Sequence, residues 1–521
     1  MKLYACLVFA FLSGALSVLG WAPFGYWPLT VIGAAGLFWL ISNSKTTLQS
    51  TCIGLAFGIG LHLVGQNWIF VSLHDKTGMP AIPAALASII FVVYLALFSA
   101  FPCLIWHALF KPQEVDGTTN RPPNWQIFAV LSYAALFSLC EWLRSMQFFY
   151  GFTSLSFGYS LIDTWLAGYV PIGGIYGLSA IGFCLSGLLT CLISGNRISR
   201  MLALILIGII ASIGLALNQI AWTKASGIPL SYRLIQPNIT QNHKFDPIFA
   251  NTQRQLLIGL IEQKPADLIV TPETTFEIHL NELPAELMSR LQQFSHQTRS
   301  HIFLGILTLS TNSDGYNSLI QIAPNQTRMA QYNKVRLMPF GEYSPTGFRW
   351  FSDELNIPFK DMSTGSINQA PFTVGLQRVG TMICYEDGSG QDARHWLPEA
   401  SFILNPSNLA WFDDSFAIDQ NLQMARMRAL EIGRPILRTT NTGITAHIDH
   451  LGNVIKRLAS QKQGVLEGMV QPVQGMTPYT RWGNWVPVLG SAIYLALIKL
   501  IHYLRRNHPI ILLRKSSTKK H

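Results

Sequence analysis

The chain has 521 residues, of which 49% are hydrophobic and only 12% are charged, and its mean hydropathy is +0.29. This composition excludes one large soluble core, because the apolar residues crowd into residues 3–222 and 485–504. Such stretches are typical of a membrane protein. The net charge of +10 does not indicate nucleic-acid binding, since the basic excess lies largely in the tail after residue 504 and no nucleic-acid motif accompanies it.

Apolar runs predict eight membrane-spanning helices. Their expected bounds are 3–19, 28–42, 50–72, 82–110, 126–146, 164–193, 199–221 and 485–504. The short loops on one side carry most of the Lys and Arg residues, whereas the loops on the other side carry little beyond Lys76. Because basic loops remain in the cytoplasm, this asymmetry predicts that both ends of the chain are cytoplasmic and that residues 223–484 are outside. The cytoplasmic loop residues are Lys45, Lys111, Arg121, Arg197 and Arg200.

We expect three parts: a seven-span bundle over 1–222, an extracytoplasmic domain over 223–484, and an eighth span with a basic tail over 485–521. The middle part alternates strand-like and helix-like patterns, which favours a layered α/β or α+β sandwich. The expected helices are 247–263, 284–299 and 416–431. The expected strands are 232–236, 267–270, 302–306, 318–322, 328–332, 379–383, 402–405, 436–438 and 445–448.

One cysteine stands apart from the other six. Cys384 ends the apolar run Val379–Ile383, whereas the other cysteines all fall in the apolar segments. It has no partner cysteine in the polar part of the chain, so we expect a free thiol. A lone buried cysteine is commonly a small apolar residue, but an unpaired thiol in an oxidising compartment is better explained by chemistry.

Two further reactive residues also follow strand-like runs. Glu273 ends one such run and Lys334 ends another, and sites in α/β sheets form at strand ends. A thiol needs a base near neutral pH, which Glu273 can supply. Acyl transfer also passes through an oxyanion, which the Lys334 ammonium can stabilise. Taken alone, each has an ordinary alternative: a helix cap for Glu273 and a solvated charge for Lys334.

The order Glu, Lys, Cys resembles the nitrilase superfamily. The flanking sequence is more similar to its membrane branch, the apolipoprotein N-acyltransferases. The resemblance covers nearly the whole chain, since that family shares the eight-span arrangement. It is carried by Tyr332–Tyr343 (YNKVRLMPFGEY), Met382–Glu386 (MICYE), Gln423–Pro435 (QMARMRALEIGRP) and Thr440–Gly443 (TNTG).

The resemblance implies a polytopic helical bundle joined to a nitrilase-like αββα sandwich. It implies Cys384 as nucleophile, Glu273 as general base and Lys334 as oxyanion stabiliser. It further implies Glu342 and Glu386 as supporting carboxylates and a pocket-shaping role for Tyr385. Four more positions match those that line the family's site: Gln236, Asn238, Asn317 and Trp411.

Some positions depart from the family pattern. Thr271 stands where the family usually has Trp, and Asp387–Gly390 follows the nucleophile where the family continues with apolar residues. Residues 347–359 place aromatic side chains beside charges and predict either a membrane-dipping arm or a loop packed on its own domain. His447 and His450 have no metal-ligand spacing, so we expect neither a metal nor another cofactor.

The family resemblance implies a multi-pass enzyme of the bacterial inner membrane with its catalytic domain in the periplasm. Such an enzyme transfers a fatty acyl chain from a phospholipid to the N-terminal α-amine of a diacylglyceryl apolipoprotein through a Cys384 thioester. Two alternatives remain open. One is a membrane-tethered carbon–nitrogen hydrolase with the same triad, and the other is a transporter or receptor. The sequence leaves headgroup, acyl length, acceptor choice and oligomeric state open, and a monomer is compatible with it.

Overall fold

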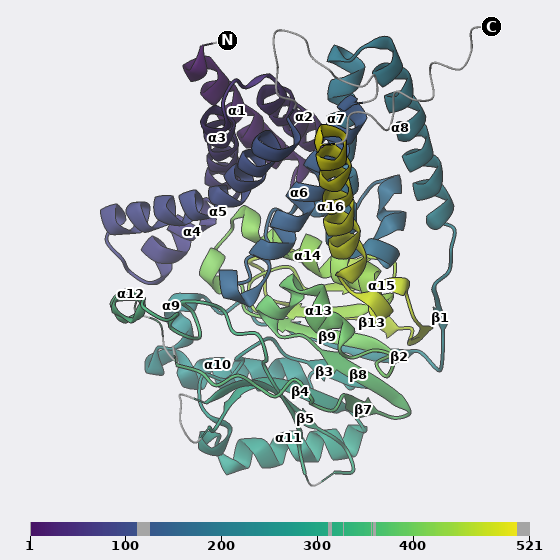
Figure 1. Cartoon of the computed structure of the whole chain (residues 1–521). Helices are drawn as coiled ribbons and strands as arrows, with labels where there is room; N and C mark the ends of the chain where they lie inside the picture. Colours follow the sequence, from purple (N-terminus) through teal and green to yellow (C-terminus); the bar gives the residue numbers. More distant parts are fainter. Residues whose placement is uncertain are drawn as a thin grey trace, which may run out of the picture.

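The computed structural model describes residues 2–111, 125–310, 315–326, 328–355, 357 and 361–507. A helical bundle forms one half of the molecule and a layered sheet domain forms the other, with the first and last labelled helices, α1 and α16, in the bundle (Figure 1). The long bundle helices are α1 (Leu3–Ser17), α2 (Trp27–Asn43), α3 (Thr47–Gly65), α5 (Ala81–Phe110), α6 (Trp125–Arg144), α7 (Val170–Ser194), α8 (Arg197–Leu217) and α16 (Trp485–Asn507).

These eight helices coincide with the eight predicted spans. Within the described ranges, six helical segments are long and apolar enough to cross a membrane, while α2 and α16 contain shorter apolar stretches. Two bounds differ from the prediction. The third helix ends at Gly65 instead of residue 72, and the sixth long helix begins at Val170 after a separate 3-10 turn. Short elements between the long helices are η1 (Val18–Gly20), α4 (Trp68–Val71), the π-helix η2 (Ser72–Lys76), η3 (Gln147–Phe149), η4 (Phe157–Leu161) and η5 (Trp165–Tyr169).

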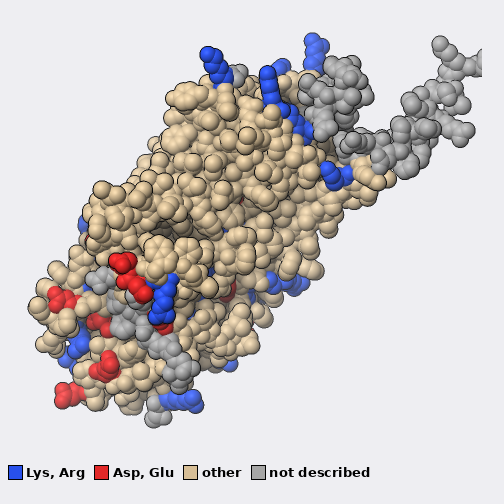
Figure 2. All heavy atoms as spheres, turned by 60° about the vertical axis from the view of Figure 1, so that its left-hand side comes forward, with Lys and Arg blue, Asp and Glu red and all other residues tan. Residues whose placement is uncertain are grey.

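Charged side chains are distributed unevenly along the molecule. Figure 2 shows Lys and Arg gathered at the end of the bundle farthest from the sheets, and a middle zone of the visible face almost without charge. Lys45 in the α2–α3 connection and Arg197 at the start of α8 belong to the basic loops that the sequence predicts for one side. This arrangement is the one expected for a bundle that crosses a lipid bilayer.

Two six-stranded sheets build the second half, together with a small pairing of β1 (Thr223–Ala225) with β14 (Val473–Gly475). One sheet has the order β13 (Gly464–Val470), β2 (Leu230–Gln236), β3 (Leu268–Val270), β4 (His301–Thr308), β5 (Tyr316–Ile322), β6 (Ala330–Asn333). The other has the order β12 (Val454–Arg457), β11 (Ala446–Ile448), β10 (Ile436–Thr440), β9 (Phe402–Ser407), β8 (Gln377–Thr381), β7 (Phe372–Val374).

Helices cover the outer faces of both sheets, which gives the predicted αββα sandwich. In β3, Val270 points into the core between the sheets, whereas Ile269 points outward into a second core with α10 and α11, as the two-residue period of a strand requires. The strand patterns did not predict β1, β7, β12, β13 and β14. The helical elements of this half are α9 (Gln241–Lys244), α10 (Pro247–Glu262), η6 (Leu280–Glu282), α11 (Ala285–Thr298), α12 (Arg349–Glu354), η7 (Cys384–Gly388), α13 (Gly390–Arg394), η8 (Ala410–Phe412), α14 (Phe416–Ile432) and α15 (Pro478–Trp482).

Helix α14 joins the two halves. Its residues Leu422 and Ala425 belong to the hydrophobic cluster of the sheet domain, while Met427 belongs to the core of the bundle. Near its end, the Glu431 carboxylate accepts a hydrogen bond of 2.8 Å from the main-chain N–H of Ile175, where Gly174 interrupts the helical backbone of α7 with φ +59°. The helix is therefore buried on both sides and fixes the sheets against the membrane bundle.

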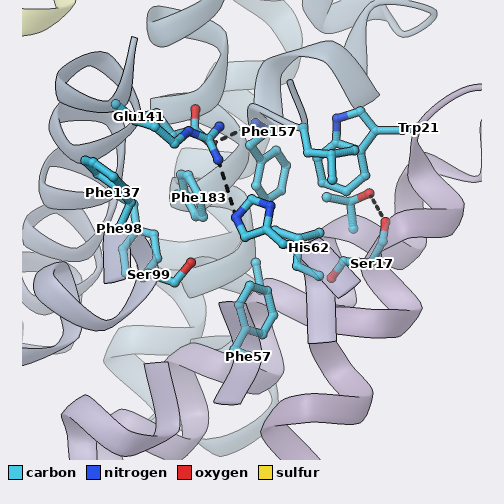
Figure 3. A pocket seen from close by; sticks show the side chains of 15 residues that line it. Ser17, Trp21, Phe57, His62, Phe98, Ser99, Phe137, Glu141, Phe157 and Phe183 are labelled. Carbon is cyan, nitrogen blue, oxygen red and sulfur yellow. Dashed lines mark hydrogen bonds between the residues drawn. The ribbon is translucent and has the colours of Figure 1, made fainter. Parts of the chain in front are cut away.

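A small pocket of about 40 Å³, lined mostly by apolar side chains, lies inside the bundle (Figure 3). The Arg144 guanidinium donates to the carbonyl of Ser154 at 3.1 Å and lies 3.4 Å from His62 Nε2. Glu141 accepts from the N–H of Phe157 at 2.8 Å. The charged groups of Glu141 and Arg144 are both directed inward, where they satisfy the irregular backbone that follows α6.

Candidate active site

A cavity of about 990 Å³ lies between the bundle and the sheets. One wall consists of α5 and of residues 66–80, which we call the bundle arm, and contributes side chains such as Met79 and Ile90. The opposite wall consists of the loops that follow the strands, and it contains Glu273, Lys334 and Cys384. The lining is predominantly apolar. The three predicted reactive residues therefore face one space that also touches a membrane helix.

Cys384 stands at a sharp turn after β8. The strand ends at Thr381, two residues earlier than predicted, and Cys384, the first residue of η7, has a left-handed φ of +50°. This backbone is uncommon for a residue with a side chain and is found at sites where the surrounding structure imposes it. It turns the chain away from the sheet directly at the thiol.

Glu273 and Lys334 are in direct contact within the cavity wall. Lys334 Nζ donates to Glu273 Oε1 at 2.8 Å and to Glu342 Oε1 at 2.9 Å. Asn317 Nδ2 donates to the same two carboxylates, at 2.7 Å each. The Cys384 thiol lies beside Glu273, and each group shifts the pKa of the other. The structure thus brings the predicted base, lysine and thiol together, with Glu342 and Asn317 completing the cluster.

The charges of this cluster set its protonation. Burial alone would raise the pKa of Glu273, but the charge of Lys334 and the hydrogen bonds from Lys334 and Asn317 hold it below its ordinary value. Burial, and then the charge of Glu273, raises the pKa of the Cys384 thiol well above its usual range. Burial opposes the charged form of Lys334, yet Glu273 and Glu342 raise its pKa well above the ordinary value. Near neutral pH the site therefore holds a thiol, a carboxylate and an ammonium, which is the starting state that general-base catalysis requires.

Glu386 ties the lysine loop to the nucleophile turn. Its Oε1 accepts from the N–H groups of Val335 at 2.6 Å and Arg336 at 3.2 Å, and its Oε2 accepts from the N–H of Ile383 at 2.6 Å. The Tyr332 hydroxyl donates to the same carboxylate at 2.9 Å. Burial raises the pKa of Glu386 to about 7, although these main-chain donors lower it. The carboxylate fixes the position of Cys384 relative to Lys334.

Tyr385 connects the nucleophile turn to the bundle. Its hydroxyl donates to the carbonyls of Tyr150 and Gly151 at 3.1 and 3.0 Å, and the ring lines the cavity. Burial is the main cause that raises the pKa of this hydroxyl, so it remains a donor. The loop after α6 thereby forms part of the cavity wall.

The four predicted substrate-contacting residues divide into two pairs. Asn317 and Trp411 line the cavity. Gln236 and Asn238 do not: the Gln236 amide donates to the carbonyls of Ala459 and Lys462 at 2.7 Å each, and the Asn238 amide donates to the carbonyl of Gln461 at 3.1 Å. Gln236 is the last residue of β2 and Asn238 follows it, which matches the strand-end pattern. Their side chains, however, hydrogen-bond the turn at residues 459–462, which does not line the cavity.

Other contributors were not expected from the sequence. The N–H of Asn408, after β9, donates to Glu273 Oε2 at 2.8 Å, and strand-end reasoning applied to the run Phe402–Asn405 would have suggested it. The bundle arm gave no such signal. Leu355 after α12 packs against Met79 of the arm, while Phe348 and Phe351 contact Phe340 of their own domain. Residues 347–355 therefore pack on both the arm and their own domain, and the membrane-dipping role stays a prediction. On the other flank, Lys76 of the arm pairs with Asp413 at 2.9 Å.

Metal ligation finds no support in the described part of the chain, where no cluster of three or more His, Cys, Asp or Glu side chains has a suitable arrangement. His447 instead contacts the hydroxyl of Tyr232 through Nδ1 at 3.1 Å.

Two family models match the chain: the apolipoprotein N-acyltransferase N-terminal domain over residues 13–188 and carbon-nitrogen hydrolase over residues 210–475. The apolipoprotein N-acyltransferase of Ralstonia nicotianae is 37% identical over 94% of this chain and 92% of its own length. That of Nitrosomonas europaea is 38% identical over 93% of this chain and 95% of its own length. That of Azotobacter vinelandii is 34% identical over 93% of both.

These similarities confirm the resemblance that the motifs indicated, and they favour an acyltransferase over the hydrolase alternative. The matched regions agree with the structure, since the first covers helices of the bundle and the second covers both sheets. The chain therefore belongs to the apolipoprotein N-acyltransferase family, as a multi-pass membrane acyltransferase with a nitrilase-like fold.

Proposed function

We propose that the protein transfers a fatty acyl chain from a membrane phospholipid to the N-terminal α-amine of a diacylglyceryl apolipoprotein through a thioester on Cys384. In the first half-reaction, the sulfur attacks the ester carbonyl while Glu273 takes the thiol proton. The Lys334 ammonium and main-chain N–H groups after Cys384 stabilise the oxyanion. The ester C–O bond then breaks, and Glu273 gives its proton to the departing lysophospholipid oxygen.

The second half-reaction reverses these roles. The neutral α-amine of the acceptor attacks the thioester carbonyl, and Glu273 takes a proton from the nitrogen. The C–S bond breaks, the sulfur recovers a proton, and the product is an amide. Glu342 and Glu386 keep Lys334 and Cys384 in position, Tyr385 and Trp411 shape the pocket, and Asn317 orients the two carboxylates.

One observation carries this proposal: the cavity that contains Cys384 is predominantly apolar and extends to membrane helix α5. Leu86 and Ile90 line it and are 56% and 70% exposed on the bundle surface. A lipid tail can thus pass from the bilayer to the thiol while it remains in apolar surroundings. A small polar amide or nitrile would need no such path.

The proposal predicts how the acyl-enzyme is discharged. A diacylglyceryl peptide with a free α-amine should release the acyl chain from Cys384 as an amide, since the apolar cavity limits the access of water. The same peptide with an acetylated α-amine should leave the adduct in place. Mass spectrometry of peptide and enzyme gives both results. Discharge by water at the rate seen with the amine would contradict the transferase proposal.

We further propose that the protein lies in the bacterial inner membrane, with the bundle over 1–222, a periplasmic catalytic domain over 223–484, and a cytoplasmic tail after the eighth span. The bias of Lys and Arg toward one end supports this orientation (Figure 2). Alkaline phosphatase fused after Lys224 should be active, whereas a fusion after Arg506 should be inactive. Equal activity of the two fusions would contradict the eight-span topology.

A further inference from the structure

A second lysine lies beside the catalytic cluster. Lys244 ends the short helix α9 and is only 3% exposed. Its ammonium donates to Thr274 Oγ1 at 2.8 Å and makes a longer contact of 3.4 Å with the main-chain carbonyl of Glu273. None of the ion pairs found within 4.0 Å among the described residues includes it. Lys244 thus contacts the backbone at Glu273, whereas Lys334 contacts the carboxylate of that residue.

Burial makes this position costly for a lysine. It lowers the pKa of Lys244 to about 8, while the charges of Glu277, Glu273 and Cys384 act in the opposite direction. A buried ammonium without a carboxylate partner is unfavourable unless its hydrogen bonds compensate. An apolar residue would be the simpler occupant. The features that distinguish a lysine here are the two contacts to residues 273 and 274 and a cation–π contact with Phe245, whose ring centroid lies 5.8 Å from the ammonium.

The backbone that Lys244 contacts is strained. Thr274 has a φ of +44°, which is a genuine outlier for a β-branched residue and persists only where neighbours impose it. On the other side of the turn, the N–H of Thr275 donates to the carbonyl of Gly305 at 2.7 Å. The Glu273–Thr275 turn is therefore held between strand β4 and the Lys244 ammonium.

We propose that Lys244 is a positioning residue for the transfer reaction: it holds the strained turn after Glu273 so that the carboxylate stays aimed at the Cys384 thiol. This inference rests on the proposed role of Glu273 as the base. Lys244 acts on the backbone of Glu273, in contrast to Lys334, which contacts its carboxylate.

The test compares Lys244→Met, Thr274→Gly and the double variant. Lys244→Met should slow both iodoacetamide alkylation of Cys384 and its acylation by saturating phospholipid by about 10- to 100-fold, the effect of a lost charge-assisted hydrogen bond. The KM for phospholipid should stay within about two-fold, because Lys244 does not line the cavity. Glycine adopts positive φ without strain, so the double variant should recover most of the lost rate.

The matched control is Lys264→Met, since the Lys264 side chain is 63% exposed, and it should leave both rates unchanged. A double variant as slow as Lys244→Met, an unchanged rate in Lys244→Met, or an effect on KM alone would each overturn the proposal. If Lys244→Met alone does not fold, the rates of the double variant serve as the test: rates near those of the unmodified protein support the proposal, and slow rates contradict it. Absence of acylation in the unmodified protein would refute the proposed function, while the alkylation rates would still test Lys244.

Discussion

Incubated with phospholipid alone, the purified protein should gain the mass of one fatty acyl chain on Cys384. The thiol shares a cavity with the lipid-facing side of α5, and its neighbour Glu273 is held in the ionised form that can accept the proton. A two-step transfer requires that this adduct form before an acceptor arrives. Intact-mass analysis should show it, and neutral hydroxylamine should remove it, as expected for a thioester.

Substitution separates this thiol from the other cysteines. Cys384→Ala should abolish the adduct, whereas Cys52→Ala in α3 should keep it at full yield, although Cys52 is also a half-buried free thiol. The contrast tests position as well as chemistry, because Cys384 lies beside the carboxylate of Glu273, whereas Cys52 lies in a bundle helix. An adduct that persists in Cys384→Ala, or none under any lipid condition, would refute the thioester route.

Much of the fold was predictable because its signals are local. Apolar runs located the eight long helices, and strand-end reasoning placed Glu273, Lys334 and Cys384 at sheet edges that the structure brings together. The same reasoning does not distinguish a site residue from a structural one. Gln236 also stands at the end of a strand, but its amide donates to the carbonyls of a neighbouring turn. Only the fold distinguishes these two uses of a polar residue.

The parts of the site that the sequence did not indicate depend on distant contacts. The bundle arm reaches the cavity only because Met79 packs against Leu355, nearly three hundred residues later. Glu386 was assigned a supporting role from its motif, but its function in joining Val335 to Ile383 follows from hydrogen bonds between separate loops. Arg144 is another example, because its guanidinium donates to the carbonyl of Ser154 in the buried loop after α6.

Glu273→Gln should slow acyl-enzyme formation by about 10²- to 10⁴-fold, the usual contribution of a general base. Glu342→Gln is the matched control, because both carboxylates accept from Lys334 and Asn317 and only Glu273 also contacts the thiol. Glu342→Gln should lower the rate of acyl-enzyme formation by about ten-fold or less. The amide oxygen still accepts hydrogen bonds, and a neutral hydrogen bond is weaker than one to a charged group by about 1 kcal/mol.

The pH dependence of these variants distinguishes a lost base from a distorted site. In the unmodified protein, neither Glu273 nor Cys384 should change its protonation across neutral pH, because the pKa of Glu273 lies below its ordinary value and that of Cys384 lies above its own. Any change of the rate near pH 7 then comes from Glu386, whose pKa is about 7. In Glu273→Gln the thiol must lose its proton to the solvent, so the rate relative to the unmodified protein should rise about ten-fold per pH unit over that range. Glu342→Gln retains the base and should follow the profile of the unmodified protein. A Glu273→Gln profile parallel to that of the unmodified protein would show that another group removes the thiol proton.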